Sequence, residues 1–337
     1  MTQVATGIPE TSDTDVDKIL AHVQKADAPV VFRQLVKDWP LIQKARVSSA
    51  AASDYLIEFC AGEPVTTFTC DAEAGGRIFY TDGLADKNFR QTREPLDQVL
   101  GKLLEYEGKR GSPTLYVGSR ALDTYLPGLS AENSLAFDAV KATVRIWIGN
   151  RTSVAAHYDV LENIACVCAG RRRFTIFPPD QLENLYIGPI DFTPAGQSIS
   201  LVDLNDPDFD KYPRFAEALA HAQTAVLEPG DAIYIPGMWW HAVEGLEGFN
   251  ILINHWWRDV PAHMGAPGDA LLHAILEIRD LPDDQRKAWR VFFDHYIFEA
   301  GTETAEHIPP NRRGVLGELD EDTARRLRAT LRNKLNR

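Results

Sequence analysis

Three residues from two segments of the chain have the types and spacing of a shared metal site. His157 and Asp159 are separated by one residue in an apolar run of β-strand character, so both side chains are expected on one face of a strand. An H-x-D pair often occurs by chance, and alone it says little. His241 closes a second segment, in which Gly230, five residues, Pro236 and four further residues precede it. Two histidines and one carboxylate leave three coordination positions open, which favours an oxygen-activating Fe(II) over a closed structural zinc site.

The elements that must position these ligands have the pattern of a β-rich domain. Between residues 114 and 257, short apolar runs are separated by glycine, proline and asparagine; they include ATVRIWIG, SVAAHYDV, RRFTIFP, DAIYIP and FNILINHWW. Many short strands with turn residues between them indicate a sandwich or barrel rather than alternating strands and helices. The first 110 residues mix helical and strand patterns, with a hairpin expected over residues 71–79 around Gly75 and Gly76. The connection over residues 178–223 breaks the rhythm, and we expect a substrate-facing insertion there.

The composition restricts the class of protein further. The chain has 337 residues, of which 45% are apolar and 25% charged, and its net charge is −13. These values exclude a wholly disordered chain, and the negative charge disfavours binding to nucleic acid. No window approaches the length of an apolar membrane span, and the N-terminus lacks the pattern of a signal peptide. Four cysteines are too few for a disulfide framework, and Cys166 and Cys168 are expected as buried apolar residues. We therefore predict a soluble cytoplasmic protein without a membrane partner.

Six segments in a compatible order resemble the cupin-like JmjC family of Fe(II)- and 2-oxoglutarate-dependent oxygenases. Within that family the chain is similar to the asparaginyl hydroxylase that inhibits hypoxia-inducible factor and to its bacterial relatives. The matching segments are WIGN (147–150), HYD (157–159), FPPDQLENLY (177–186), DLNDPDFDKYPRF (203–215), EPGDAIYIPGMWWHAV (228–243) and NHWW (254–257). The segment PVVFRQLVKDWP (29–40) and the helical tail are also similar, so the resemblance covers most of the chain.

The resemblance implies a role for each matching site residue. His157, Asp159 and His241 would be the iron ligands. Arg172 stands where the family usually has a lysine that pairs with the distal carboxylate of 2-oxoglutarate, and arginine can bind a carboxylate through two parallel hydrogen bonds. Further positions that match residues lining the cofactor pocket are Tyr116, Asn163 and Asn254.

Two neighbouring positions depart from that assignment or lie outside it. Where the family often has a threonine, this chain has Val154, and Ser153 or Thr152 is expected to supply the hydroxyl instead. His255, one residue beyond Asn254, should face the opposite side of its strand and is expected to be structural.

The resemblance also implies the fold and the organisation of the chain. We expect a mainly β protein with helices, built on a double-stranded β-helix (the cupin or JmjC jelly roll) with N-terminal α/β decoration and C-terminal helices. The expected parts are an N-terminal α/β region over 1–112, the barrel core over 113–260 and a helical extension over 261–337. Helices of this extension commonly form a dimer interface in the family, so a homodimer is expected.

The predicted activity is that of a 2-oxoglutarate-dependent dioxygenase with Fe(II) as cofactor and 2-oxoglutarate as cosubstrate, forming succinate and carbon dioxide. A hydroxylase acting on a protein side chain or a small metabolite is favoured over a demethylase, because the match is closest to the hydroxylases. Three alternatives remain open. They are a non-redox metal-binding cupin, a catalytically silent binding module, and a tRNA hydroxylase, which the net charge of −13 disfavours.

Overall fold

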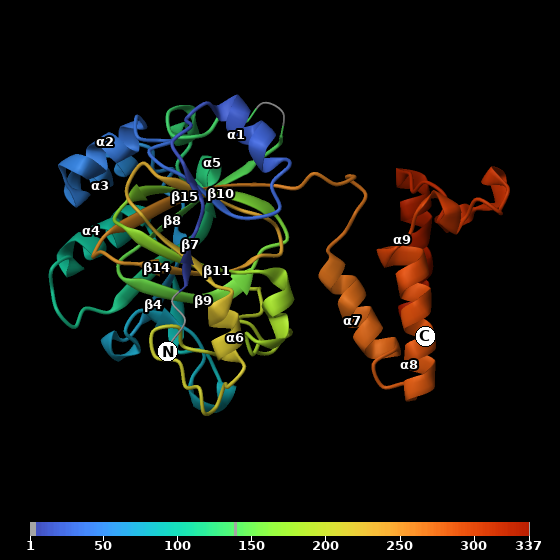
Figure 1. Cartoon of the computed structure of the whole chain (residues 1–337). Helices are drawn as coiled ribbons and strands as arrows, with labels where there is room; N and C mark the ends of the chain where they lie inside the picture. The colour runs from blue at the N-terminus through green and yellow to red at the C-terminus, as the bar shows by residue number, and fades with distance from the viewer. Residues whose placement is uncertain (1–4, 138–139, 337) are drawn as a thin grey trace. The chain divides into compact units, whose positions relative to one another are not determined.

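The computed structural model describes residues 5–137 and 140–336, and two mixed sheets dominate it (Figure 1). The larger sheet has nine strands in the order β2 (Glu10–Thr11), β3 (Val30–Phe32), β13 (Ala232–Ile235), β10 (Glu162–Ala169), β15 (Asn250–Trp257), β8 (Thr143–Gly149), β7 (Thr114–Ala121), β4 (Val65–Cys70) and β6 (Phe89–Glu94). The smaller sheet has six, in the order β1 (Thr6–Gly7), β12 (Gln223–Leu227), β11 (Arg172–Phe177), β14 (Trp240–Gly245), β9 (Thr152–Tyr158) and β5 (Arg77–Ile78).

The strand order is that of a jelly roll. Along the chain the strands cross between the sheets: β8, β10, β13 and β15 lie in the larger sheet, whereas β9, β11, β12 and β14 lie in the smaller one. All pairings among these eight strands are antiparallel. The predicted double-stranded β-helix is therefore confirmed, although the two sheets form a sandwich and do not close into one barrel within the described residues.

Alternation along the strands of the larger sheet separates an inner face from an outer face. On β15, Leu252 belongs to the cluster between the sheets, whereas Ile251 and Ile253 belong to a cluster with the helices outside. Those helices are α1 (Val16–Val23), α2 (Pro40–Val47), α3 (Ser49–Ile57), α4 (Leu96–Tyr106) and α5 (Leu122–Tyr125). Because both faces are covered, the central strands are apolar throughout rather than alternating with polar residues.

Two sequence features that could have indicated chemistry, the Cys166–Cys168 pair and His255, lie on the outer face of the larger sheet. Cys166 and Cys168 are fully buried, unpaired and packed among apolar residues of the outer cluster, as expected. His255 is also fully buried on that side, where its Nε2 lies 2.9 Å from Ser134 Oγ and accepts a hydrogen bond from the backbone N–H of Leu135 at 3.0 Å. Its expected structural role is confirmed.

The N-terminal region extends both sheets instead of standing apart from them. Strands β4, β6 and β7 continue the larger sheet beyond β8. The hairpin predicted over residues 71–79 is wrong: a 3-10 turn over Ala72–Ala74 follows β4, and β5 then pairs in parallel with β9 of the other sheet. The tertiary partner decides here, because Gly76 at φ 88° lies against the backbone of Arg151, where a Cβ would come within 2.8 Å of the carbonyl oxygen.

The chain divides into two compact units, the second of which begins at Asp259. This second unit is helical, as expected, with α7 (Pro267–Glu277), α8 (Asp283–Phe293), a π-helical turn over Asp294–Phe298 and α9 (Glu321–Leu335). Neither α7 nor α8 buries a residue, and both expose large apolar side chains, among them Leu276, Trp289 and Phe292. The division of the first unit at residues 112 and 113 stays a prediction.

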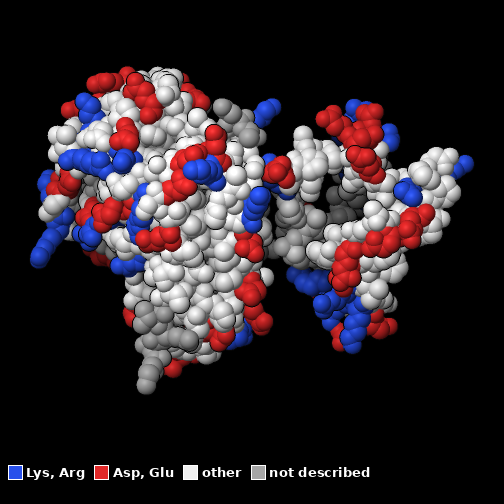
Figure 2. Space-filling view, turned by 45° about the horizontal axis from the view of Figure 1, so that its top comes forward, with Lys and Arg blue, Asp and Glu red and all other residues white. Residues whose placement is uncertain are grey.

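The surface has no strongly charged single-sign face in the view of Figure 2, where acidic and basic side chains are interspersed. Within the described ranges, no helix combines the length and the apolar character that crossing a membrane requires. The remaining helix of the first unit, α6 (Phe215–Ala220), lies in the 178–223 connection just before β12.

Candidate metal centre

His157, Asp159 and His241 converge from two adjacent strands of the smaller sheet. One potential ligand atom from each lies within 4.8 Å of the others, and the described residues contain no other such trio of His, Cys, Asp or Glu. The two histidines are direct cross-strand partners on β9 and β14, with ring centroids 4.3 Å apart. Nε2 of His241 lies 3.7 Å from Oδ2 of Asp159. The structure thus brings together the three residues that the sequence singled out.

The two imidazoles are held so that Nε2 faces the shared point. Nδ1 of His157 is 2.9 Å from the carbonyl oxygen of Ala155, and Nδ1 of His241 is 3.0 Å from that of Trp239. A ring that donates its Nδ1–H to a carbonyl keeps its lone pair on Nε2, the tautomer that a metal requires. Burial, reinforced by the neighbouring His157, lowers the pKa of His241 to about 4. His241 is therefore neutral near pH 7 and able to act as a ligand.

A strained turn links the two ligand segments. The backbone N–H of Met238 donates to the carbonyl oxygen of Asp159 at 2.7 Å, and Met238 has a φ of 70°. A residue with a side chain in this left-handed region costs about 1–3 kcal/mol, which the surrounding contacts must offset. Tyr234 on β13 helps to do so: its hydroxyl donates to Glu162 Oε2 at 2.6 Å, and the same oxygen accepts the Gly237 N–H at 3.4 Å.

A small inner cavity of about 50 Å³ lies between the two sheets next to these ligands. Its lining includes the three ligand candidates together with Tyr116, Asn163, Arg172 and Asn254, so the structure brings these seven residues to one cavity. Their roles as cofactor contacts stay a prediction. Asn254 on β15 donates to Asn163 Oδ1 on β10 at 2.8 Å, which fixes both amides across the sheet. Asn254 Oδ1 makes no hydrogen bond with the described residues.

Arg172 is the most unusual group in this cavity. Its side chain is only 2% exposed, yet its Nε and Nη2 atoms make no hydrogen bond with the described residues. Burial lowers the pKa of Arg172, and Tyr116 and Cys168 partly counter that effect. A buried, unpaired guanidinium is costly unless an anion joins it, so the cavity is suited to a carboxylate. Burial also raises the pKa of Tyr116, so its hydroxyl remains a neutral donor.

The structure does not support Ser153 as a cofactor contact. A β-bulge on β9 places the partners of Val243 and His241 three residues apart, at Val154 and His157. The bulge reverses the alternation, so Val154 lines the cavity with His157, whereas Ser153 lines neither this cavity nor the larger one outside it. Simple period-two counting could not detect this irregularity.

A larger cavity of about 710 Å³, called the outer cavity here, is lined by two of the three ligand candidates, His157 and Asp159. It shares six lining residues with the inner cavity: Tyr116, Trp147, Val154, His157, Asp159 and Trp256. Residues 193–197 and Ile199 form part of its lining, so the 178–223 connection contributes the expected insertion to this wall. A molecule in the outer cavity would therefore lie next to His157 and Asp159.

Sequence reasoning missed three cationic residues of the outer cavity: Lys87, Arg120 and Arg145. Arg145 precedes Trp147 by two residues on β8, so strand alternation could have placed it on the inner face. Lys87 lies in the segment before β6, and Arg120 lies on β7 where the register shifts, so neither position carries a comparable signal.

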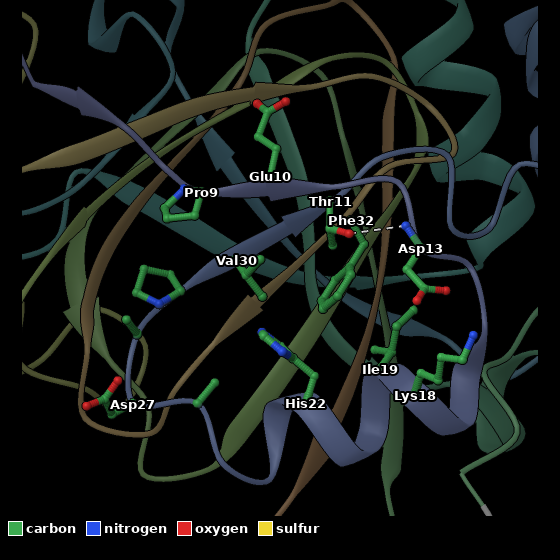
Figure 3. A pocket seen from close by; sticks show the side chains of 13 residues that line it. Pro9, Glu10, Thr11, Asp13, Lys18, Ile19, His22, Asp27, Val30 and Phe32 are labelled. Carbon is green, nitrogen blue, oxygen red and sulfur yellow. Dashed lines mark hydrogen bonds between the residues drawn. The ribbon is translucent and has the colours of Figure 1, made fainter.

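A third cavity of the first unit lies away from these residues, between α1 and the pair β2–β3. Figure 3 shows Val30, Phe32 and His22 at its wall, with the N–H of Asp13 bonded to Thr11 Oγ1 at 3.2 Å. Its volume is about 650 Å³. None of the three candidate ligands lines it, and it shares no lining residue with the inner or the outer cavity.

Comparison with known proteins agrees with this geometry. The family described as a cupin-like domain matches residues 17–263. The tRNA wybutosine-synthesizing protein 5 of Gallus gallus is 33% identical over 129 residues, covering 38% of this chain and 35% of that protein. Lysine-specific demethylase 8 of Xenopus tropicalis is 26% identical over 262 residues, covering 75% of this chain and 53% of that protein. The chain thus spans about a third to a half of the length of these relatives.

Two further similarities are more limited. Lysine-specific demethylase JMJ31 of Arabidopsis thaliana is 30% identical over 129 residues, which cover 36% of this chain and 23% of that protein. The X-ray structure of E. coli ycfD aligns with 79% of this chain and 60% of its own at 17% identity, with a TM-score of 0.41.

Proposed function

This chain belongs to the cupin-like domain family, and from that membership we propose that it is an Fe(II)- and 2-oxoglutarate-dependent oxygenase that hydroxylates its substrate. One observation carries the proposal. A His–Asp–His group with both Nε2 atoms turned inward shares a cavity with a buried arginine that has unpaired donors. Neither feature is stable on its own in an apolar interior, and a cation with a chelating dianion would satisfy both.

The three ligand candidates would hold Fe(II) from one side only. His157 and His241 are fixed by their Nδ1 hydrogen bonds to backbone carbonyls, so little side-chain entropy is lost when Nε2 binds. Asp159 follows the last residue of β9 and supplies the negative charge. Three protein ligands leave the remaining positions open for small molecules, the pattern of non-haem Fe(II) oxygenases.

The inner cavity would hold 2-oxoglutarate. Arg172 would pair with its distal carboxylate, while Tyr116 and Asn254 of the larger sheet also line the cavity and would supply further polar groups. Apolar neighbours such as Phe174 and Leu252 line the rest of this cavity and keep water away from the cosubstrate. When bound, Fe(II) and 2-oxoglutarate would supply the oxidising chemistry: dioxygen is consumed, 2-oxoglutarate yields succinate and carbon dioxide, and one oxygen atom enters the substrate.

Relatives support this reaction class and leave the substrate open. Two of those described above are named lysine-specific demethylases, and one is named for wybutosine synthesis on tRNA. Hydroxylation of a protein side chain or a small metabolite remains our proposal, with a homodimer formed through the C-terminal helices and a cytoplasmic location as further expectations.

The proposal is tested by anaerobic titration of the Fe(II)-loaded protein with 2-oxoglutarate. A chelated 2-oxo acid on Fe(II) gives a visible charge-transfer band, and we expect this band in the wild type. It should vanish in His157→Ala and persist in the control His221→Ala, which removes an exposed histidine that lines neither cavity. Metal affinity is measured in parallel by calorimetry.

Each alternative gives a distinct result. Metal binding without a charge-transfer band and without succinate in aerobic assays would refute the 2-oxoglutarate assignment and favour a non-redox cupin. No metal binding at all would favour a catalytically silent binding module. A band in wild type together with turnover only in the presence of tRNA would support the tRNA hydroxylase instead of our preferred substrates.

A further inference from the structure

The charged residues of the outer cavity are nearly all cationic. Lys87, Arg120 and Arg145 line it, and the only carboxylate in its lining is Asp159, which the proposed function assigns to the metal. The bias is notable because acidic residues outnumber basic ones, 48 to 35, in the whole chain. None of the three cations has a carboxylate within ion-pair distance among the residues that the structure describes.

Two of these cations are fixed by one irregularity of β7. The register of β7 against β8 shifts between Val117 and Arg120, and Ser119 has a φ of 43°. Arg145 Nη1 donates to the carbonyl oxygen of Ser119 at 3.1 Å and lies 3.3 Å from its Oγ, while Arg120 Nε donates to the carbonyl oxygen of Gly118 at 2.7 Å. Each guanidinium is thus anchored through one nitrogen and keeps other N–H groups for a ligand.

The third cation comes from a different part of the wall. Lys87 Nζ lies 3.4 Å from the carbonyl oxygen of Pro194, in the 178–223 connection. The same Nζ is 5.9 Å from the ring centres of Phe89 and Phe192, so two aromatic rings restrict the ammonium. Positive charge therefore enters the cavity from the larger sheet and also from the side of the insertion.

Two indole side chains of the cavity lining add no negative charge beside these cations. Trp147 and Trp256 line both cavities, and their buried Nε1 atoms make no hydrogen bond with the described residues. Their rings meet edge to face at 6.0 Å, and the Arg145 guanidinium lies 5.9 Å from the centre of the Trp256 ring. A ligand in the outer cavity thus meets cations beside neutral aromatic rings, and the cations suit an oxyanion.

We propose that the outer cavity binds a small substrate with a carboxylate or phosphate group, held by Arg120, Arg145 and Lys87 while a neighbouring carbon faces the metal. The proposal rests on the proposed function for the chemistry but not for the binding. A volume of about 710 Å³ is within the range of small-molecule sites, about 300–1,000 Å³. An arginine-clamped anion would also fix the orientation of the reacting C–H bond, as oxygen insertion requires.

Calorimetric titration of the metal-free full-length protein tests the binding directly. The probes are inorganic phosphate and N-acetylaspartate, which separate the two sources of negative charge. We expect at least one probe to bind the wild type and to bind at least tenfold more weakly to the double variant Arg120→Gln/Arg145→Gln. Affinity should be unchanged in the control Arg173→Gln, which removes a half-exposed arginine of β11 that pairs with Glu244. Circular dichroism melting checks that each variant is folded.

A second set of variants separates this site from the inner cavity. Arg172→Gln should leave probe binding within about twofold of wild type, because Arg172 lines only the inner cavity. Loss of probe binding in Arg172→Gln but not in the double variant would overturn the proposal, as would failure of both probes to bind. A short RNA that binds in place of both small anions, and loses affinity in the double variant, would also overturn it in favour of a nucleic-acid substrate.

These outcomes are independent of the proposed function. The probes are titrated without Fe(II), dioxygen or 2-oxoglutarate, so a failed charge-transfer titration would not affect them. Conversely, a wild-type band that also survives in Arg120→Gln/Arg145→Gln, combined with absent probe binding, would uphold the oxygenase and refute only the anionic substrate.

Discussion

Replacing Arg172 with methionine should have opposite effects on the free protein and on its complex with 2-oxoglutarate. In the free protein the guanidinium is 2% exposed, and its Nε and Nη2 lack hydrogen-bond partners among the described residues. Folding must therefore desolvate a charge without compensation. Methionine fills much of the same space with an unbranched apolar chain and removes that cost.

The expected magnitudes follow from the burial. Replacing buried charged groups with apolar residues is typically neutral or stabilising by about 1–4 kcal/mol. For a unit of this size, each kcal/mol raises the midpoint of thermal unfolding by about 2–4 °C. In the complex, truncating one member of a buried, hydrogen-bonded charge pair costs about 2–5 kcal/mol. At about 1.4 kcal/mol per tenfold change, the affinity for 2-oxoglutarate should fall at least about 30-fold.

Thermal melts of the metal-free protein and the anaerobic charge-transfer titration measure the two effects. Arg172→Lys is the matched control, since it keeps the charge and loses the planar fork; we expect affinity between those of the wild type and Arg172→Met. The reasoning is refuted if Arg172→Met melts well below the wild type, or if it binds 2-oxoglutarate as tightly as the wild type does. The first result would mean that the guanidinium is already stabilised in the free protein, and the second that it does not hold the cosubstrate.

Three other perturbations address stability and assembly. Burial lowers the pKa of His255 to about 4 from 6.5, so the unfolded chain gains a proton that the folded protein does not. This contribution to the free energy of unfolding should be fully present above pH 6.5 and should fall toward pH 4 by up to about 1.4 kcal/mol per pH unit. Urea unfolding at several pH values measures the slope, which should be shallower in His255→Gln. Asp231 is 2% exposed, pairs with Arg33 at 2.6 Å and accepts the N–H groups of Gln34 and Glu228. Asp231→Ala should therefore cost about 3–5 kcal/mol of unfolding free energy, and a loss below about 1 kcal/mol would show that water replaces the carboxylate. The exposed apolar side chains of α7 and α8 should form a dimer interface, so light scattering should give twice the 37.6 kDa chain mass. The double variant Trp289→Glu/Phe292→Glu should be monomeric, and a monomeric wild type at micromolar concentration would contradict the prediction.

The metal ligands could be found from the sequence because each lies in a local pattern with a physical cause. Strand alternation puts His157 and Asp159 on one face, and the Gly230–Pro236–His241 spacing describes a turn, a short strand and a return. The same local logic identified the apolar role of Cys166 and Cys168 and the outward direction of His255. In each case a single strand and its periodicity were sufficient.

Predictions made from the alternation of side chains along a strand failed where the backbone departs from regular geometry. The bulge on β9 turns Val154 inward and excludes Ser153 from both cavities, and the shifted register of β7 brings Arg120 and the Ser119 carbonyl to the outer cavity. The supposed hairpin over residues 71–79 became an edge strand of the opposite sheet, because its partner β9 lies about 75 residues further along the chain. Bulges and long-range pairings depend on tertiary contacts that no local pattern encodes.

By itself the sequence determined which residues could bind a metal, because ligand chemistry depends on residue type and on a periodicity that a single strand enforces. It also determined the β-rich fold, because short apolar runs with turn residues can bury their faces only in packed sheets. Only the tertiary structure decided that Arg172 is buried beside those ligands, with Nε and Nη2 making no hydrogen bond to the described residues, and that three cations from separate segments share the outer cavity. Burial and the convergence of distant segments are properties of the packed chain, since they arise only when two sheets enclose the same space.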